Sequence, residues 1–216
     1  MRLVFIRHGE MQGDPWCRPS RPVSGCLSER GIAQATATGR ALAGRSWHHV
    51  FASPLGRALQ TAEIVCGQTA PITILDCLQE WLPNPDLVKA PSTVWEEMMR
   101  RDANRPVEEL WQTNAGEGTY SFFGRVVPGV LHALDAIGCH PRHGGYVLDD
   151  GLANAQVAIV AHGGSLGVLL THLLGLRPFP ASSFGFQLAG VAELELFPHA
   201  GVCHVRLICS APGSEI

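Results

Sequence analysis

The hydrophobic pattern of the chain alternates between two kinds of segment. Short continuous apolar runs, such as Leu3–Ile6 and 156–162, are typical of strands that are covered on both faces of a sheet. Between such runs lie segments such as 27–44, in which apolar residues recur at the three- and four-residue spacing of a helix. This alternation predicts an α/β fold, a three-layer α/β/α sandwich with a mostly parallel sheet.

Residues that favour the ends of elements refine this pattern. Ser28 is a suitable N-cap, with Glu29 in the first turn of the helix that follows, and Pro54 and Gly67 bracket the next helix. A hairpin is expected around the turn 198–201. The expected strands are 3–6, 48–53, 72–78, 156–162, 190–197 and 202–208, the expected helices are 27–44, 54–67, 122–138 and 163–175, and 140–155 is expected to be a loop.

The length of 216 residues fits a single domain, 1–216. Residues 82–124 differ in character, because prolines, tryptophans and acids gather there. We predict that this stretch is a helical insertion that covers the active site. Its aromatic residues either line a substrate pocket or pack the insertion onto the sheet.

Composition excludes several classes of protein. A net charge of −3 provides no broad basic surface for nucleic acid. Seven cysteines without a C-x-x-C pair favour free thiols over a disulfide framework or a zinc site. The apolar run before Arg7 is too short for a signal peptide, and no run approaches the ~18 apolar residues of a membrane span. We therefore expect a cytoplasmic protein that does not bind membranes.

Reactive side chains follow the predicted parallel strands. The first strand ends at Arg7 and His8, the second leads to Ser53 and a helix that carries Arg57, the third leads to Glu80, and the fourth ends at His162, Gly163 and Gly164. Ligands of such sheets bind beyond the carboxyl ends of the strands. If these strands are neighbours, two arginines, two histidines and a glutamate converge on one pocket.

This set of residues suits phosphoryl transfer. A guanidinium group binds two phosphate oxygens at once, and the N-terminus of a helix presents free N–H groups to an anion. Glycines such as Gly163 let the backbone approach a phosphate closely. A neutral imidazole is a good nucleophile, and a carboxyl group can protonate the departing oxygen and later deprotonate a water.

The motifs "IRHGE", "LSERGIAQA", "ASPLGRALQTAEIV", "LQE" and "VAHGGSLGVLL" together resemble the histidine phosphatase superfamily, which includes the phosphoglycerate mutases. The resemblance implies that His8 forms a phosphohistidine and that Glu80 is the proton donor. It also implies that Arg7, Arg57 and His162, with Gly163, hold the phosphoryl group. The two arginines and His162 provide the positive field that a metal would otherwise supply, so the resemblance implies no metal and no cofactor.

The chain departs from the family pattern at a few positions. Met11 and Asp14 stand where many members have Ser or Thr and then a phosphate-binding Asn. "EWLPNPD" replaces the W-E-G of mutases after the catalytic acid, and "GEG" at 116–118 replaces G-E-S. These changes favour a phosphatase for a small phosphorylated substrate over a mutase. Mutase-type phosphoryl transfer and a low-activity module that binds a phosphorylated ligand are the alternatives.

Other residues offer weaker candidates. "GGSLG" satisfies the G-x-S-x-G pattern of serine hydrolases, with Ser165 as nucleophile, but no aspartate follows Ser165 and a triad is disfavoured. Glu10 and Glu117 are alternative acids, and Glu10 is more readily expected to orient the arginines or a histidine of the pocket. "HPRH" at 140–143 resembles a short metal motif but fits a solvated loop better.

Overall fold

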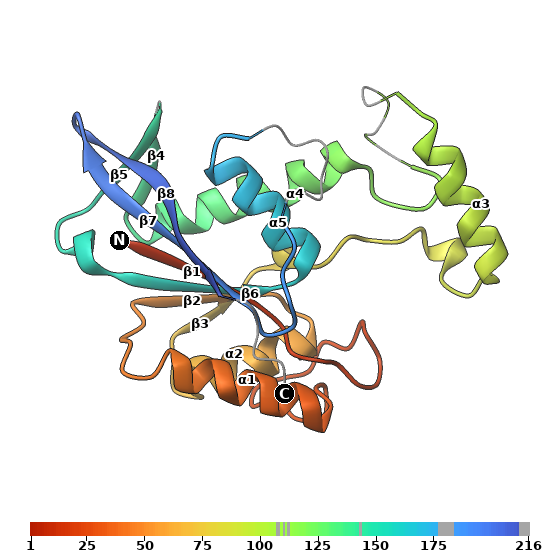
Figure 1. Ribbon diagram of the computed structural model, residues 1–216, viewed down its shortest axis with the longest axis horizontal. Helices are drawn as coiled ribbons and strands as arrows, with labels where there is room; N and C mark the ends of the chain where they lie inside the picture. Colours follow the sequence, from red (N-terminus) through yellow and green to blue (C-terminus); the bar gives the residue numbers. More distant parts are fainter. Residues whose placement is uncertain (107–108, 110, 112, 143, 177–183, 212–216) are drawn as a thin grey trace.

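In the computed structural model, which describes residues 1–106, 109, 111, 113–142, 144–176 and 184–211, eight strands form one sheet in the order β3-β2-β6-β1-β7-β8-β5-β4 (Figure 1). The strands are β1 Arg2–Arg7, β2 His49–Ala52, β3 Ile72–Ile74, β4 Cys139–Arg142, β5 Gly145–Leu148, β6 Gln156–Ala161, β7 Val191–His199 and β8 Val202–Ala211.

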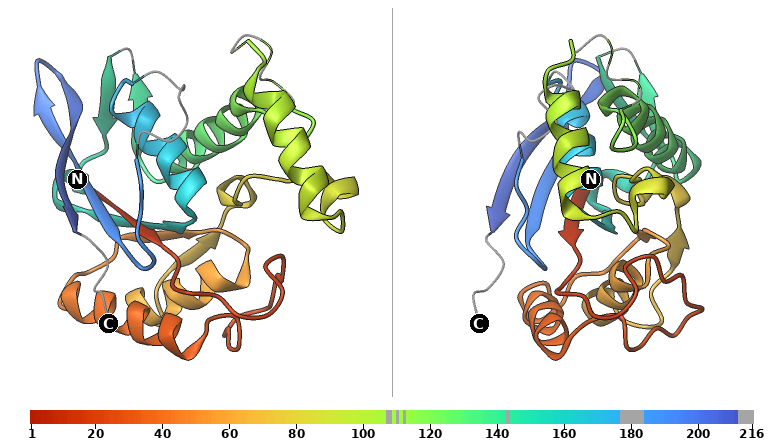
Figure 2. Two further views of the ribbon diagram at one scale, coloured as in Figure 1. Left: turned by 45° about the vertical axis from the view of Figure 1, so that its right-hand side comes forward. Right: turned by 90° about the vertical axis from the view of Figure 1, so that its right-hand side faces the viewer.

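Helices cover both faces of this sheet. α1 (Glu29–Ala41) and α2 (Gly56–Cys66) lie together on one face, and α4 (Thr119–Ala136) and α5 (Gly163–Leu173) lie on the other (Figure 1). α3 (Ser92–Ala103) projects away from the sheet, as Figure 1 and the left view of Figure 2 show. Within the described part of the chain, no helix is long and apolar enough to cross a membrane. The described residues also form the short 3-10 helices η1 Asp76–Leu78, η2 Pro85–Leu87 and η4 Leu152–Asn154.

The buried central strands divide the core into two layers. In β1, Leu3 and Phe5 pack with α4 and α5, whereas Val4 and Ile6 pack with α1 and α2. Successive side chains of a strand point to opposite faces of its sheet, so an uninterrupted apolar run fills both layers. The expected α/β sandwich is thereby confirmed.

The sheet has a parallel half and an antiparallel half. β3, β2, β6 and β1 are parallel neighbours, and all further pairings, from β1–β7 to β5–β4, are antiparallel. The parallel half directs the carboxyl ends of four strands to one edge. The predicted hairpin is also present, formed by β7 and β8.

The prediction of a loop at 140–155 was wrong. This stretch contributes β5, most of β4 and the 3-10 helix η4. Its glycines and Pro141 suggested a loop, but β4 is an edge strand, where a proline removes no essential hydrogen bond. His143, the last residue of the "HPRH" motif, lies outside the described residues.

Two further boundaries differ from the prediction. The strand expected at 72–78 ends after Ile74 and continues as η1. The helix expected from residue 122 begins at Thr119, which places Pro128 in the helix interior. Residues 119–124, which we assigned to the insertion, therefore belong to α4. The described part of 82–118, within the stretch predicted to be an insertion, contains η2 and α3.

A close backbone approach joins the loop after β1 to the start of α1. A Cβ atom added to Gly31 would lie 2.0 Å from the carbonyl oxygen of Glu10, and one added to Gly9 would lie 2.6 Å from the carbonyl oxygen of Gly31. Both contacts involve backbone, which cannot rotate away. Glycine at these positions therefore lets the loop after His8 lie directly on α1.

We expect Gly31→Ala to lower the free energy of unfolding by about 1–3 kcal/mol, because the added methyl group overlaps backbone. Gly124→Ala is the matched control in α4, where an added Cβ meets nothing within 4 Å. The control should gain about 0.5–1 kcal/mol, because alanine favours the helix. Urea unfolding of both variants measures the difference, and equal effects would contradict the close approach.

Candidate active site

His8 follows β1 directly and is buried, with only 7% of its surface exposed. Its Nδ1 lies 2.7 Å from the carbonyl oxygen of Gly9. The Nε–H of Arg57 donates to Nε2 of His8 over 3.2 Å. A carbonyl oxygen only accepts and a guanidinium only donates, so the proton of the neutral ring is on Nδ1 and the lone pair is on Nε2.

The surroundings of His8 favour its neutral form. Burial lowers the pKa of His8 to about 3, and the positive charges of Arg57 and Arg7 act in the same direction. The hydrogen bond to Gly9 opposes this shift. The imidazole therefore keeps its nucleophilic lone pair at neutral pH.

Two arginines lie beside this ring. Arg7 donates from Nη1 to the carbonyl oxygen of Phe186 over 2.5 Å, and its buried Nε has no hydrogen-bond partner among the described residues. Arg57 donates from Nη1 to the carbonyl oxygen of Pro15. Backbone carbonyls thus hold both guanidinium groups without neutralising them, which leaves their charge available to an anion.

His162 directly follows the neighbouring strand β6 and is fully buried, with its ring centroid 5.0 Å from that of His8. Its Nε2 lies 2.8 Å from Oγ of Ser53, and its buried Nδ1 has no partner in the described structure. Burial lowers the pKa of His162 well below its usual value, and the positive charges of Arg57 and Arg7 lower it further. The ring is therefore neutral, and Ser53 fixes its orientation.

Glu80 is held at the N-terminus of α5. Its Oε2 accepts from the N–H of Gly164 over 3.1 Å, and its Oε1 accepts from the N–H of Trp81 over 2.9 Å. A Cβ atom on Gly164 would lie only 2.3 Å from Oε1 of Glu80. A side chain at position 164 would therefore displace the carboxylate, which explains the second glycine after His162.

The structure thus brings His8, Arg7, Arg57, His162 and Glu80 to one edge of the sheet. Ser53 belongs to the same group through its contact with His162. Gly163 also lies there, since a Cβ atom on it would come 3.5 Å from the guanidinium of Arg7.

Glu10 has a different place from the one expected. Its Oε1 accepts from the hydroxyl of Ser28 over 2.7 Å, and its Oε2 lies 3.7 Å from Nη1 of Arg30. These contacts join the loop after β1 to the start of α1. We expected Glu10 to orient an arginine or histidine of the pocket. Its side chain instead contacts Ser28 and Arg30, so this expectation was wrong.

The two unusual residues of this loop have structural contacts. Met11 pairs with Leu27 in an isolated β-bridge. Oδ1 of Asp14 accepts from the N–H of Trp16 over 2.9 Å. This contact forms a local turn beside Pro15, whose carbonyl receives Arg57.

Ser165 is part of a helix cap. Its buried hydroxyl accepts from the N–H of His162 over 3.3 Å and lies 3.4 Å from the carbonyl oxygen of the same residue. The hydroxyl thus caps the start of α5, because it binds the backbone of the N-cap residue His162. The resemblance of "GGSLG" to a serine nucleophile therefore has a structural explanation.

Arg125 was missed by the sequence analysis. It lies on α4, donates to the backbone carbonyls around Glu80 and pairs with Glu117, the alternative acid. A single arginine between the apolar pairs Phe122–Phe123 and Val126–Val127 is the signal that could have revealed it. A charge in such a position needs a buried partner.

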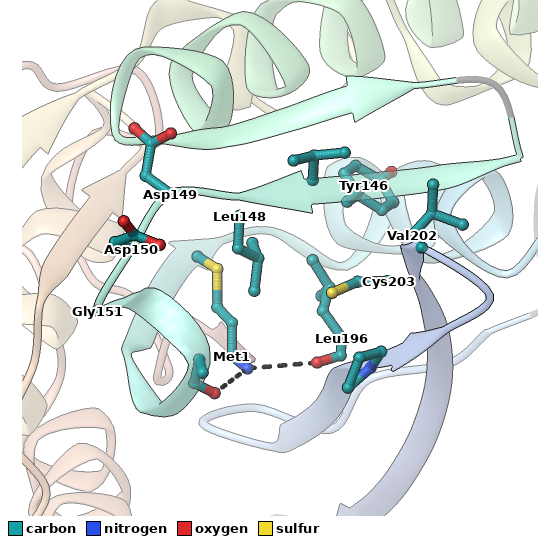
Figure 3. A pocket seen from close by; sticks show the side chains of 13 residues that line it. Met1, Tyr146, Leu148, Asp149, Asp150, Gly151, Leu196, Val202 and Cys203 are labelled. Atoms are coloured by element: carbon teal, nitrogen blue, oxygen red, sulfur yellow. Dashed lines mark hydrogen bonds between the residues drawn. The ribbon is translucent and has the colours of Figure 1, made fainter.

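A separate cavity of about 400 Å³ lies among Met1, Tyr146, Leu148, Leu196 and Cys203 (Figure 3). The amine of Met1 donates to the carbonyl oxygens of Ala153 and Leu196 beside it. This cavity lies at the amino end of β1, whereas His8 follows the carboxyl end. It is therefore distinct from the candidate active site.

A family model of the histidine phosphatase superfamily (branch 1) matches residues 3–207. The chain belongs to this superfamily, as its motifs indicated. The probable phosphoglycerate mutase GpmB of Erwinia tasmaniensis is 29% identical over 185 residues, which cover 82% of this chain and 76% of that protein.

Solved structures of phosphatases share the fold. The α-ribazole phosphatase of Shigella flexneri has a TM-score of 0.67 at 24% identity, with 100% of each chain covered. The mycobacterial glucosyl-3-phosphoglycerate phosphatase, in a complex with VO3, has a TM-score of 0.66 at 24% identity, with 99% of each chain covered. At this level of identity, the likeness establishes the fold alone.

The buried neutral His8 predicts a pH-dependent stability. Its pKa of about 3 lies below the ordinary value of 6.5, so the unfolded chain binds one more proton between these values. The contribution of His8 to stability is present above about pH 6.5 and is lost as the pH falls toward 3, by up to about 1.4 kcal/mol per pH unit. Urea unfolding of wild type and His8→Gln between pH 7.5 and 4.5 should show the shallower slope in the variant. Identical slopes would contradict a buried neutral imidazole.

Proposed function

We propose that the protein hydrolyses phosphate monoesters through a phosphohistidine intermediate on His8. The observation that carries this proposal is the tautomer of His8. Its Nδ1–H is tied to Gly9, and its Nε2 lone pair faces the cation of Arg57. A lone pair beside a cation that binds phosphate is the arrangement that an attack on phosphorus requires.

In the first step, Nε2 of His8 forms a bond to phosphorus while the ester P–O bond breaks. The departing oxygen takes a proton from Glu80. The phosphorylated ring carries a positive charge, which the Nδ1–H bond to the carbonyl of Gly9 stabilises. To enter, the substrate displaces the contact between Arg57 and His8, and a phosphate oxygen then accepts the Arg57 N–H instead.

In the second step, Glu80 accepts a proton from a water molecule, whose oxygen attacks phosphorus as the P–N bond breaks. Inorganic phosphate leaves, and His8 and Glu80 return to their initial forms. The same carboxyl group thus serves first as acid and then as base. The hydrogen bond from the N–H of Gly164 keeps this carboxyl group at the N-terminus of α5, near the phosphoryl group.

The positive field of the site comes from the protein itself in this mechanism. Nε of Arg7 and Nδ1 of His162 are buried and lack protein partners within the described residues, so each suits a phosphoryl oxygen. For His162 this requires the proton on Nδ1, with Nε2 accepting from the hydroxyl of Ser53. We therefore propose a reaction that needs no metal and no cofactor.

The proposed substrate is a small phosphate ester. The structural neighbours carry names of phosphatases for such compounds, α-ribazole phosphate and glucosyl-3-phosphoglycerate. The sequence relatives instead carry the name of phosphoglycerate mutases, which supports phosphoryl transfer to a second hydroxyl as the alternative. Incubation with 3-phosphoglycerate distinguishes the two, because a phosphatase releases inorganic phosphate and a mutase forms the 2-phosphate isomer.

His8→Ala should lower the hydrolysis of p-nitrophenyl phosphate by about 10³-fold or more, because the reaction loses its nucleophile. His140→Ala is the control, since His140 contacts Asp135 and Asp149 outside the site. Wild-type protein quenched at alkaline pH should carry a phosphoryl group on His8 by mass spectrometry. Full activity of His8→Ala would disprove the assignment, and a protein that binds phosphate without turnover would be the binding module instead.

Glu80→Gln should lower kcat/KM for an alkyl phosphate by about 10²-fold or more, but much less for p-nitrophenyl phosphate. A poor leaving group needs a proton as it departs, whereas p-nitrophenolate does not. The ratio kcat/KM isolates this step because it extends only to release of the leaving group. Equal losses on both substrates would show that Glu80 is not the acid.

A further inference from the structure

The backbone that carries Glu80 differs from the rest of the candidate site. His8 and His162 follow strands in the middle of the sheet, and Arg57 lies in the first turn of α2. Glu80 instead lies outside the strands of the sheet, on an irregular stretch between η1 and η2. Backbone pairing with residues 115–117 begins only at Leu82, after Glu80. A group that must transfer a proton needs a fixed position, so another part of the molecule must provide it.

One guanidinium group supports this stretch. Arg125 donates from Nη1 to the carbonyl oxygens of Cys77 and Gln79, over 2.9 and 3.2 Å. It donates from Nη2 to the carbonyl oxygen of Glu80 itself over 3.2 Å. These three bonds reach across the segment from α4, a helix whose apolar face is packed in the core.

Glu117 completes the arrangement from the other side. Its carboxylate accepts from Nε and Nη2 of Arg125, each over 2.8 Å, in a bidentate pair. It also accepts from the N–H of Leu82 over 3.3 Å, and the backbone carbonyl of Glu117 accepts from Nε1 of Trp81 over 2.5 Å. The residues on both sides of the Glu80 carboxylate are thereby tied to one ion pair.

This ion pair is shielded from water. The side chain of Glu117 is only 10% exposed and that of Arg125 only 21% exposed. Bidentate geometry fixes direction as well as distance, which a flexible surface pair does not. Removing the guanidinium would leave three carbonyl groups and a largely buried carboxylate without this donor. The segment that carries Glu80 would then shift relative to α5.

We propose that Arg125 and Glu117 are positioning residues that hold Glu80 in line with the leaving group. This proposal rests on the proposed function, in which Glu80 is the general acid. Neither residue transfers a proton. They fix the backbone of residues 77–82 so that the Glu80 carboxylate stays on the N–H of Gly164, next to the phosphoryl site.

The test uses the full chain and the variant Arg125→Met, which retains much of the volume of the side chain but loses its hydrogen bonds. We expect kcat/KM for an alkyl phosphate to fall by about 30-fold or more, because small displacements of a catalytic group are costly. For p-nitrophenyl phosphate the loss should stay within about fivefold, since that leaving group needs little protonation. Arg101→Met, which removes an exposed arginine of α3, is the matched control and should change neither value.

A double-mutant cycle separates positioning from a general effect on structure. In the Glu80→Gln background, Arg125→Met should change kcat/KM for the alkyl phosphate by less than about threefold, because no acid remains to be positioned. Equal losses on both substrates, or additive losses in the cycle, would overturn the proposal. Glu117→Gln is the milder second variant, since it keeps the bonds from Arg125 to the carbonyls. It should show the same selective loss on a smaller scale, even if Arg125→Met fails to fold.

These variants distinguish a failure of the proposed function from a failure of the positioning role. If Glu80→Gln itself affects both substrates equally, the assignment of the acid is wrong and the proposed function must change. If Glu80→Gln is selective for the alkyl phosphate but Arg125→Met and Glu117→Gln are not, the acid stands and the positioning role is disproved.

Discussion

The candidate active site depends on keeping one imidazole neutral among cations. His8 is buried beside Arg7 and Arg57, and both burial and those positive charges disfavour a proton on its ring. The carbonyl of Gly9 holds the remaining proton on Nδ1, which leaves the lone pair on Nε2 facing Arg57. A protonated His8 would repel the same cations that a phosphate needs. The arrangement therefore combines a nucleophile with an anion site in one place.

Two kinds of support hold the reactive groups. The proposed nucleophile and the proposed phosphate-binding residues follow parallel strands or lie in the first turn of a helix, where the sheet and the two core layers fix the backbone. Glu80, the proposed proton donor, lies on irregular backbone, which hydrogen bonds from Arg125 connect to α4 and to Glu117. In the proposed mechanism, the sheet therefore positions the groups that bind phosphate, whereas side-chain contacts position the group that transfers a proton.

The predictions succeeded where the signal is local in the chain. The apolar run of β1 identified a central strand, and the motif residues His8 and His162 lie at the ends of neighbouring strands as expected. The loop prediction for 140–155 failed because Pro141 is compatible with a strand only at a sheet edge, a position that pairing alone reveals. The partner of Glu10 was missed for a related reason, since Ser28 meets it only after Gly9 and Gly31 bring the loop against α1.

The sequence by itself determined the superfamily, the α/β class and the set of candidate reactive residues, because hydrophobic periodicity and motif spacing are properties of the chain. Tertiary structure decided which nitrogen of His8 is free, where Glu10 binds and what supports Glu80. These depend on contacts between residues far apart in sequence, such as the hydrogen bond from Arg125 to the carbonyl of Glu80. No local pattern encodes such a contact, since its geometry exists only after the sheet and α4 have packed together.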